Sequence, residues 1–395
     1  SSREHQALAH LPAFGYISEH ILIPRYDDKM FKEADIETII PSIMERYSLN
    51  RPQAYAVTNA VVDPGSFTLI QGPPGTGKTR VIESIISTIT TGPSSPSMLP
   101  MARNRSRIML CAPSNAAVDE VVRRLISAKV NVVRVGSADM IEESVKPVCL
   151  DALVEKKMKS MMENYNDRMG ELRSVTNDLN NQVMIAEKTQ VGDLQSIKKG
   201  LWTAKEAMRK LTRELEDAKA ATRTKILQDA SVVACTLSGA GHDIFSRLHF
   251  SNLLFEYVIV DEACQAAEVS TLIPLQWGAR KVVLVGDPNQ LPPTILSQAA
   301  ISGAYEQSLF KRLQKANPEQ VLLLSVQYRM HPQISQFPSN YYYQSRLVNG
   351  PGMAIETSRP WHAVGALGPY RFFDVPGQEE KRSMSNGTFT KSTLN

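Results

Sequence analysis

Cysteine is scarce in this sequence. The four cysteines lie far apart, with no C-x-x-C pair and no histidine partner at zinc spacing, so neither a disulfide framework nor a structural zinc site is expected. Three of them lie within apolar runs, where cysteine behaves as a small hydrophobic residue. The pattern predicts an intracellular, reducing compartment; the four residues are Cys111, Cys149, Cys235 and Cys264.

Long apolar runs and a strong charge excess are also missing. No apolar run reaches about 18 residues, the length that a membrane span needs, and the start of the chain lacks a signal-peptide core, so no membrane partner is expected. The chain does not begin with Met, which is typical of a piece cut from a longer protein. A net charge of +4 over 395 residues fits a nucleic-acid binder but also many other enzymes. The length and ordinary composition predict a globular protein of two or three domains.

Short runs rich in β-branched residues alternate with helical stretches. Such near-continuous apolar runs predict an α/β fold with a parallel sheet that helices cover on both faces. The Pro/Ser-rich, basic stretch 91–107 is expected to be a surface loop. The predicted strands are 67–71, 107–112, 131–136, 231–235, 257–261, 281–286 and 321–326.

The stretch from 151 to 225 interrupts this alternation. There is no proline between Pro147 and Pro274, and two series of apolar residues keep three-four spacing on either side of a break near 188–193. This pattern predicts an antiparallel helical hairpin, in which residues from about 155 to 225 bury their apolar stripe against each other and not against the sheet. Its charges fit the solvated exterior of a coiled coil better than a dedicated RNA-binding face. The two seams are Met158, Met162, Tyr165, Met169, Leu172, Leu179, Val183 and Ala186, with Thr176 as a polar interruption, and Leu194, Ile197, Leu201, Ala204, Met208, Leu211, Leu215 and Ala218.

A glycine-rich turn between a predicted strand and a predicted helix fits G-x-x-x-x-G-K-[ST]. Glycines let backbone N–H groups turn inward around phosphate oxygens, and the next helix directs its positive end at the same anion. The lysine can reach the β and γ phosphates, and the threonine hydroxyl can ligate Mg²⁺. A glycine turn that binds nothing is the alternative, and this context disfavours it. The residues are Gly72, Pro73, Pro74, Gly75, Thr76, Gly77, Lys78 and Thr79.

An acidic pair, Asp261 and Glu262, follows the apolar run 257–260. Ligands bind at the carboxyl ends of strands in parallel sheets. We expect Asp261 to hold magnesium and Glu262 to orient and deprotonate the attacking water. The pair predicts nucleotide hydrolysis because a phosphate loop occurs in the same chain.

Five motifs occur in order: Q-G-P-P-G-T-G-K-T, C-A-P-S-N-A-A-V-D, D-E-A-C-Q, G-D-P-N-Q-L-P-P and Q-Y-R-M-H-P. They begin at Gln71, Cys111, Asp261, Gly286 and Gln327. The set resembles the superfamily 1 helicases related to senataxin and to the nonsense-mediated-decay helicase. The resemblance covers about residues 49–373. The last motif, together with the stretch 49–53 (L-N-R-P-Q), which resembles the family's Q-motif, disfavours a generic AAA-type ATPase.

The resemblance implies further nucleotide contacts. Gln53 would read the adenine edge, since a side-chain amide donates and accepts at once. Gln290 resembles the glutamine that senses the γ-phosphate. Arg329 resembles the arginine that stabilises the transition state. Tyr328 is either an adenine-stacking residue or a packed one.

The resemblance also implies loops that grip the nucleic-acid backbone, where short hydroxyl and amide side chains suit contacts without sequence information. Ser114 and Asn115 also fit the cap of a helix that begins near Ala116. The residues 341–343, three tyrosines, fit packed core better than a base-stacking platform. The hairpin matches the family's prong, a candidate strand separator. The gripping residues are Pro113, Ser114, Asn115, Thr236, Leu237 and Ser238.

The expected organisation is a RecA-like domain formed by 46–150 and 226–330, with the prong at 151–225. Residues 1–45 are read as the remnant of an N-terminal stalk or barrel, and 331–395 as the incomplete start of a second RecA-like lobe with a polar tail.

By resemblance, the chain uses ATP and Mg²⁺ and moves 5′ to 3′ on single-stranded RNA or DNA. The same resemblance implies a nuclear role in transcription termination and in resolving RNA–DNA hybrids, with transcription or RNA-processing proteins as partners. The alternative is a short form that binds nucleotide, RNA or protein without unwinding.

Overall fold

The computed structural model describes residues 1–14, 16–22, 33–63, 65–91, 106–190, 193–250, 254–374, 378–383 and 389–394. The chain divides into two compact units, one of residues 1–73 and 77–324 and one of residues 74–76 and 325–395. Most of the surface loop expected at 91–107 lies outside the described residues.

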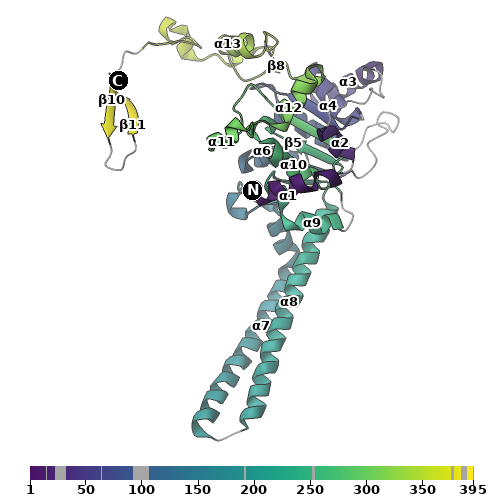
Figure 1. Ribbon diagram of the computed structural model, residues 1–395, viewed down its shortest axis with the longest axis vertical. Coiled ribbons are helices and arrows are strands. Elements are labelled where there is room, and N and C mark those ends of the chain that lie inside the picture. The colour runs from purple at the N-terminus through teal and green to yellow at the C-terminus, as the bar shows by residue number, and fades with distance from the viewer. Residues whose placement is uncertain are drawn as a thin grey trace. The chain divides into compact units, whose positions relative to one another are not determined.

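The first unit is built on a seven-stranded sheet of order β3-β4-β2-β5-β6-β1-β7, in which all neighbouring strands pair in parallel (Figure 1). Each strand lies within or next to a run that the sequence predicts as a strand. The strands are β1 (Phe67–Gln71), β2 (Ile108–Ala112), β3 (Val132–Arg134), β4 (Val232–Thr236), β5 (Tyr257–Val260), β6 (Lys281–Gly286) and β7 (Val321–Leu323).

Successive strand residues alternate between two apolar cores, one on each face of the sheet. Leu69 and Ile70, for example, belong to different cores. Helices cover both faces, as the parallel pattern predicts. The first core receives α1 (Ser2–His10), α2 (Tyr16–Leu22), α9 (Asp243–Phe250), α10 (Glu268–Leu275) and α12 (Leu309–Ala316). The second receives α3 (Glu33–Tyr47), α4 (Arg51–Val62), α5 (Lys78–Thr91) and α6 (Asn115–Ser127).

The N-terminal residues form part of this core, a role that the sequence does not reveal. Ala7 and Ile17 are fully buried on one face of the sheet, and Ile36 and Ile40 are 2% exposed on the other. Whatever else the segment 1–45 does, its described helices complete the core of the first unit.

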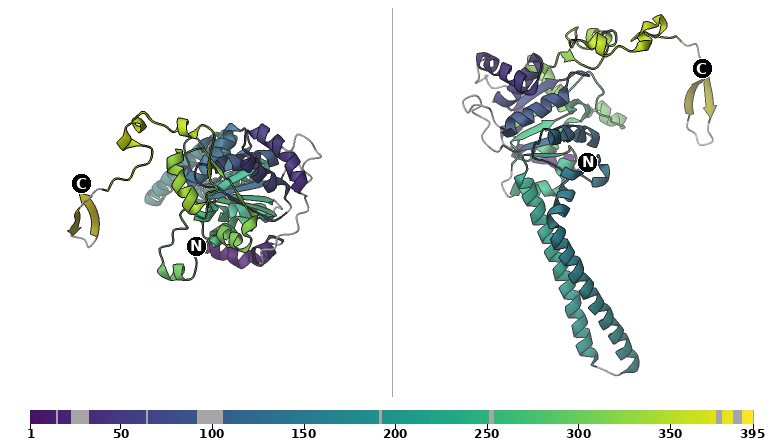
Figure 2. Two further views of the ribbon diagram at one scale, coloured as in Figure 1. Left: turned by 90° about the horizontal axis from the view of Figure 1, so that it is seen from above. Right: turned by 180° about the vertical axis from the view of Figure 1, so that it is seen from behind.

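The helical hairpin is formed by α7 (Leu150–Thr189) and α8 (Leu194–Asp229), which run side by side away from the sheet (Figures 1 and 2). Helices of 40 and 36 residues extend roughly 55–60 Å at 1.5 Å per residue. The residues of both predicted seams are buried or half-buried, and the Thr176 hydroxyl donates to Leu172 O at 2.7 Å.

The base of the hairpin is not independent of the sheet. Val154, Met158 and Leu215 are each 4–6% exposed and belong to the core on the α1 face of the sheet. The expectation that residues from about 155 to 225 bury their apolar stripe only against each other is therefore wrong near the base, because the two helices enter the unit there. None of the described helices is long and apolar enough to cross a membrane.

The second unit contains β8 (Val326–Gln327) and β9 (Val348–Asn349), which pair in parallel, with α13 (Pro332–Tyr342) between them. The predicted strand 321–326 is therefore two strands, of which β7 ends at Leu323 in the first unit. Further elements are α14 (Met353–Glu356) and the antiparallel pair β10 (Gln378–Ser383) and β11 (Phe389–Leu394).

The three tyrosines at 341–343 are not all core residues. Tyr343 is buried, but Tyr341 and Tyr342 are 72% and 47% exposed. Tyr341 stacks on Phe337 with ring centroids 5.6 Å apart. The core interpretation is wrong for two of the three, because the end of α13 turns them away from the buried side of the unit.

Candidate nucleotide and nucleic-acid sites

The predicted phosphate loop connects β1 to α5. Gly75 and Gly77 have φ of 77° and 82°, which is the left-handed region that glycine adopts without strain. At Gly77 a Cβ atom would also lie 2.7 Å from Gln53 Nε2. The loop conformation therefore requires glycine at these positions, as the motif predicts.

Lys78 and Glu262 meet at the carboxyl edge of the sheet. Lys78 Nζ lies 3.4 Å from Glu262 Oε1 and donates to Gly72 O at 3.1 Å. The other carboxylate oxygen of Glu262 accepts from Gln265 Nε2 at 3.2 Å. Glu262 adopts φ 49° and ψ 40°, a left-handed conformation that is strained for a residue with a side chain. The fold thus holds an ion pair of the expected lysine and the expected base at the end of β5.

Asp261 is 5% exposed, and its Oδ1 accepts from the backbone N–H of Glu262 at 2.9 Å. Burial, and secondarily the charge of Glu262, raises its pKa from 3.8 to about 7. A cation beside this carboxylate would offset the desolvation, and oxygen donors are those that Mg²⁺ prefers. Asp261 and the half-buried Thr79 hydroxyl at the start of α5 are the residues that would hold a magnesium ion.

Asp287 joins the phosphate loop to Gln290. It is 1% exposed; its Oδ1 accepts from Gln71 Nε2 at 3.3 Å and its Oδ2 from Gln290 Nε2 at 2.9 Å. Asn289 N–H donates to the same carboxylate at 3.2 Å. In the sequence Asp287 is only one member of the motif that begins at Gly286, with no role of its own predicted. Its place after β6, which pairs with β1, was the signal that it reaches the phosphate loop.

Gln53 lies at the third position of α4, where it forms a reciprocal cap with Asn50. Its Oε1 accepts from Asn50 N–H at 3.1 Å, and Asn50 Oδ1 accepts from Gln53 N–H at 2.9 Å. The side chain is 4% exposed, and its amide nitrogen faces Gly77. The structure thus brings Gln53 to the phosphate loop, while reading adenine remains a prediction.

Arg329 and Tyr328 belong to the second unit, and both are exposed. Their backbone is fixed: Arg329 N–H donates to Gln327 Oε1 at 2.9 Å, and Tyr328 N–H donates to Gly75 O at 2.8 Å. Gln327 is fully buried and also donates to Asn349 Oδ1 at 2.6 Å. Hydrogen bonds thus hold the backbone of the Q-Y-R segment, and the roles of Tyr328 and Arg329 remain predictions.

The candidate nucleic-acid loops follow the adjacent strands β2 and β4, which pair from Ile108 with Val232 to Ala112 with Thr236. Ser114 caps α6 by accepting from Ala117 N–H at 3.2 Å, and Asn115 is the first helical residue. Pro113, Asn115 and Thr236 are half-buried, and Ser114 and Ser238 are exposed. Leu237 differs, because its side chain is 3% exposed and packs in the core; only its backbone could contact a ligand.

Three features meet at one edge of the parallel sheet. They are the phosphate loop after β1, the acidic pair Asp261 and Glu262 after β5, and the carboxylate of Asp287 after β6. These features define a RecA-like P-loop nucleotide-binding domain with a helical insertion.

Comparison with known proteins identifies the family. Two family models described as AAA domain match residues 48–298 and 305–395. The chain is 39% identical to helicase sen1 of Schizosaccharomyces pombe over 96% of this chain and 24% of the relative. It is 37% identical to helicase SEN1 of Saccharomyces cerevisiae, over 90% of this chain and 18% of the relative. It is 31% identical to human probable helicase senataxin, over 83% of this chain and 14% of the relative. The chain belongs to the superfamily 1 helicases of the senataxin type.

The chain spans less than a quarter of the length of these three relatives. The second match runs to residue 395, so family similarity extends past residue 373, where the motifs alone placed its end. Among solved structures, an arterivirus non-structural protein 10 helicase in complex with DNA aligns over 75% of this chain and 44% of that chain. The identity is 11% and the TM-score 0.35, too low to bear on the fold.

Proposed function

We propose that this chain carries the ATP-hydrolysing core of a helicase that moves 5′ to 3′ along single-stranded RNA or DNA. The observation that carries the proposal is the convergence of Lys78, Asp261 and Glu262 at the carboxyl edge of the sheet, with Lys78 Nζ 3.4 Å from Glu262 Oε1. Direction of movement, nuclear localisation and roles in transcription termination and RNA–DNA hybrid removal follow the family resemblance.

In the proposed reaction the loop amides, the N-terminal end of α5 and Lys78 hold the β and γ phosphates of ATP. Lys78 Nζ would exchange its contact with Glu262 for the phosphates, which frees the carboxylate. Glu262 then takes a proton from water as the water oxygen bonds to the γ phosphorus. The bond to the β–γ bridging oxygen breaks, and ADP and phosphate leave. Asp261 and Thr79 would hold magnesium, which would neutralise part of the phosphate charge.

Coupling to nucleic acid is proposed to run through Gln290. Its side-chain amide shares Asp287 with Gln71, the residue before the phosphate loop. Loss of the γ-phosphate would change the hydrogen bonds of this shared carboxylate. The position of the loop that follows β6 would change with them. Arg329 is the candidate for the cation at the γ-phosphate.

The test is ATP hydrolysis with and without single-stranded RNA and DNA, measured on this chain and on a longer form of the same protein. We expect stimulation in the longer form and its loss in Lys78→Ala, with Lys315→Ala, on the exposed side of α12, as the matched control. Hydrolysis confined to the longer form would favour the short-form alternative for this chain. No stimulation in either form would contradict the proposed function.

A further inference from the structure

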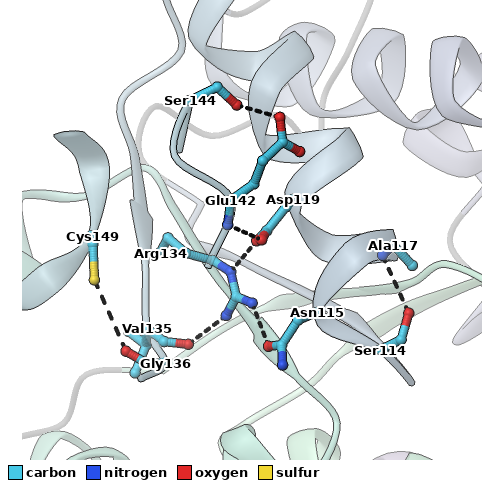
Figure 3. A network of polar contacts seen from close by, with 10 residues as sticks. All are labelled: Ser114, Asn115, Ala117, Asp119, Arg134, Val135, Gly136, Glu142, Ser144 and Cys149. Atoms are coloured by element: carbon cyan, nitrogen blue, oxygen red, sulfur yellow. Dashed lines mark hydrogen bonds and ion pairs between the residues drawn. The ribbon is translucent and has the colours of Figure 1, made fainter. Parts of the chain in front are cut away.

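Arg134, the last residue of β3, is a buried cation. It is fully buried and uses three nitrogens: Nε donates to Asp119 Oδ1 at 2.7 Å, Nη1 to Val135 O at 2.6 Å and Nη2 to Asn115 Oδ1 at 2.7 Å (Figure 3). A guanidinium in such an environment must be paired and hydrogen-bonded, because unpaired burial of its charge is strongly unfavourable. Each of its partners is therefore held in place.

Asp119 is held from a second direction. Its Oδ2 accepts from Glu142 N–H at 2.9 Å, and its side chain is 2% exposed. Asp119 and Asn115 are four residues apart on α6, so both side chains lie on the face of the helix that meets Arg134. The first turn of α6, which follows the candidate gripping loop, is thereby tied to the edge strand of the sheet.

The chemistry of Arg134 determines how the Asn115 amide is oriented. A guanidinium has only donors, so only the amide oxygen of Asn115 can face it. The amide nitrogen must then point the other way, as Figure 3 shows. Within the described part of the chain no acceptor contacts this nitrogen, and the residue is half-buried beside the exposed Ser114.

We propose that Arg134 and Asp119 are positioning residues for nucleic-acid binding: they turn Asn115 so that it presents an N–H donor to a phosphate oxygen of the bound strand. The proposal rests on the proposed function of this edge of the sheet. A donor fixed in this way fits an anionic backbone and carries no base preference.

The test compares Asn115→Asp with Asn115→Ala by titrating a fluorescent single-stranded oligonucleotide. Aspartate keeps an oxygen on Arg134 but turns a second, charged oxygen toward the phosphate. We expect affinity to fall by roughly three- to fivefold for alanine, which loses one hydrogen bond, and by more than about tenfold for aspartate. Asn317→Asp, a half-buried asparagine before the amino end of β7, is the matched control and should bind as the parent does. Magnesium–ATP affinity should be unchanged in all three.

Arg134→Lys tests the positioning role, because lysine keeps the charge near Asp119 but cannot span all three partners. We expect weaker oligonucleotide binding with unchanged nucleotide affinity, and no further loss when it is combined with Asn115→Ala. Additive losses would mean that Arg134 acts only on stability, which would overturn the positioning role. If Asn115→Asp bound the oligonucleotide with the same affinity as the parent, or with the same affinity as Asn115→Ala, the proposed role of Asn115 as a donor would be overturned. Failure of the parent chain to bind any oligonucleotide would instead remove the proposed function, and this inference with it.

Discussion

Asp261→Asn should make the protein more stable while it damages the proposed magnesium site. Asp261 is 5% exposed, and its carboxyl accepts a hydrogen bond from Glu262 N–H. Asparagine has nearly the same shape and can offer its amide oxygen to the same N–H. The substitution removes an ionisable carboxyl group. Burial raises the pKa of that group from 3.8 to about 7.

The sign follows from proton linkage. Between pH 3.8 and about 7 the unfolded chain loses this proton while the folded chain keeps it, so rising pH lowers the free energy of unfolding. Each pH unit contributes about 1.4 kcal/mol, which gives a penalty on the order of 4 kcal/mol above pH 7. The asparagine variant lacks this penalty, so its advantage should grow by roughly 2–3 kcal/mol from pH 5 to pH 8.

The assay is urea unfolding of parent and variant at pH 5 and pH 8, without nucleotide and with a chelator present. The control is Asp119→Asn, which should lose about 3–5 kcal/mol at both pH values because it leaves the buried Arg134 uncompensated. An advantage of Asp261→Asn that is equal at both pH values, or a variant less stable than the parent at pH 8, would refute the reasoning. Magnesium-dependent nucleotide affinity should fall in Asp261→Asn.

Three further outcomes are expected. Glu262→Gln should keep ATP affinity but lose turnover in a longer form, since it removes the proton acceptor and keeps the shape; hydrolysis at the parent rate would contradict the role of Glu262. Oligonucleotide affinity should fall by on the order of tenfold or more between 50 and 200 mM salt and vary little with sequence; strong discrimination between unrelated strands of equal length would oppose a backbone grip. Deleting residues 173–207 and joining Leu172 to Met208 with a short Gly/Ser linker should preserve nucleotide binding but reduce duplex unwinding by a longer form; full unwinding would make the hairpin a spacer.

The boundaries of that deletion show what the sequence could and could not predict. Three-four spacing identifies the hairpin and its seam because each apolar residue meets the partner helix at regular intervals. The same spacing continues toward the base, where Met158 and Leu215 belong to the core on the α1 face of the sheet. Periodicity reports which face of a helix is apolar, and not what covers it.

The candidate site divides in a similar way. The phosphate loop and the Asp261–Glu262 pair were predictable because a short contiguous motif holds the residues. Arg134 was not, since the run N-V-V-R-V-G reads as a buried strand in which an arginine is out of place. Its partner Asp119 lies 15 residues away, on a different element. Packing of α6 against the edge of the sheet creates that pair, and no local pattern encodes it.

Backbone hydrogen bonds to the end of β2 connect the two candidate sites. Asp261 N–H donates to Cys111 O at 2.8 Å, and Leu237 N–H donates to Ala112 O at 3.0 Å. The carbonyls at the end of β2 therefore accept from the proposed magnesium ligand on one side and from the second candidate nucleic-acid loop on the other. All of these groups lie at the ends of buried parallel strands, whose backbones resist displacement. A change in nucleotide state within this unit must then act first through side chains that have alternative partners. Glu262 and Gln290 fit that description, because their amide and carboxylate contacts, to Lys78, Gln265 and Asp287, can be exchanged without moving a strand.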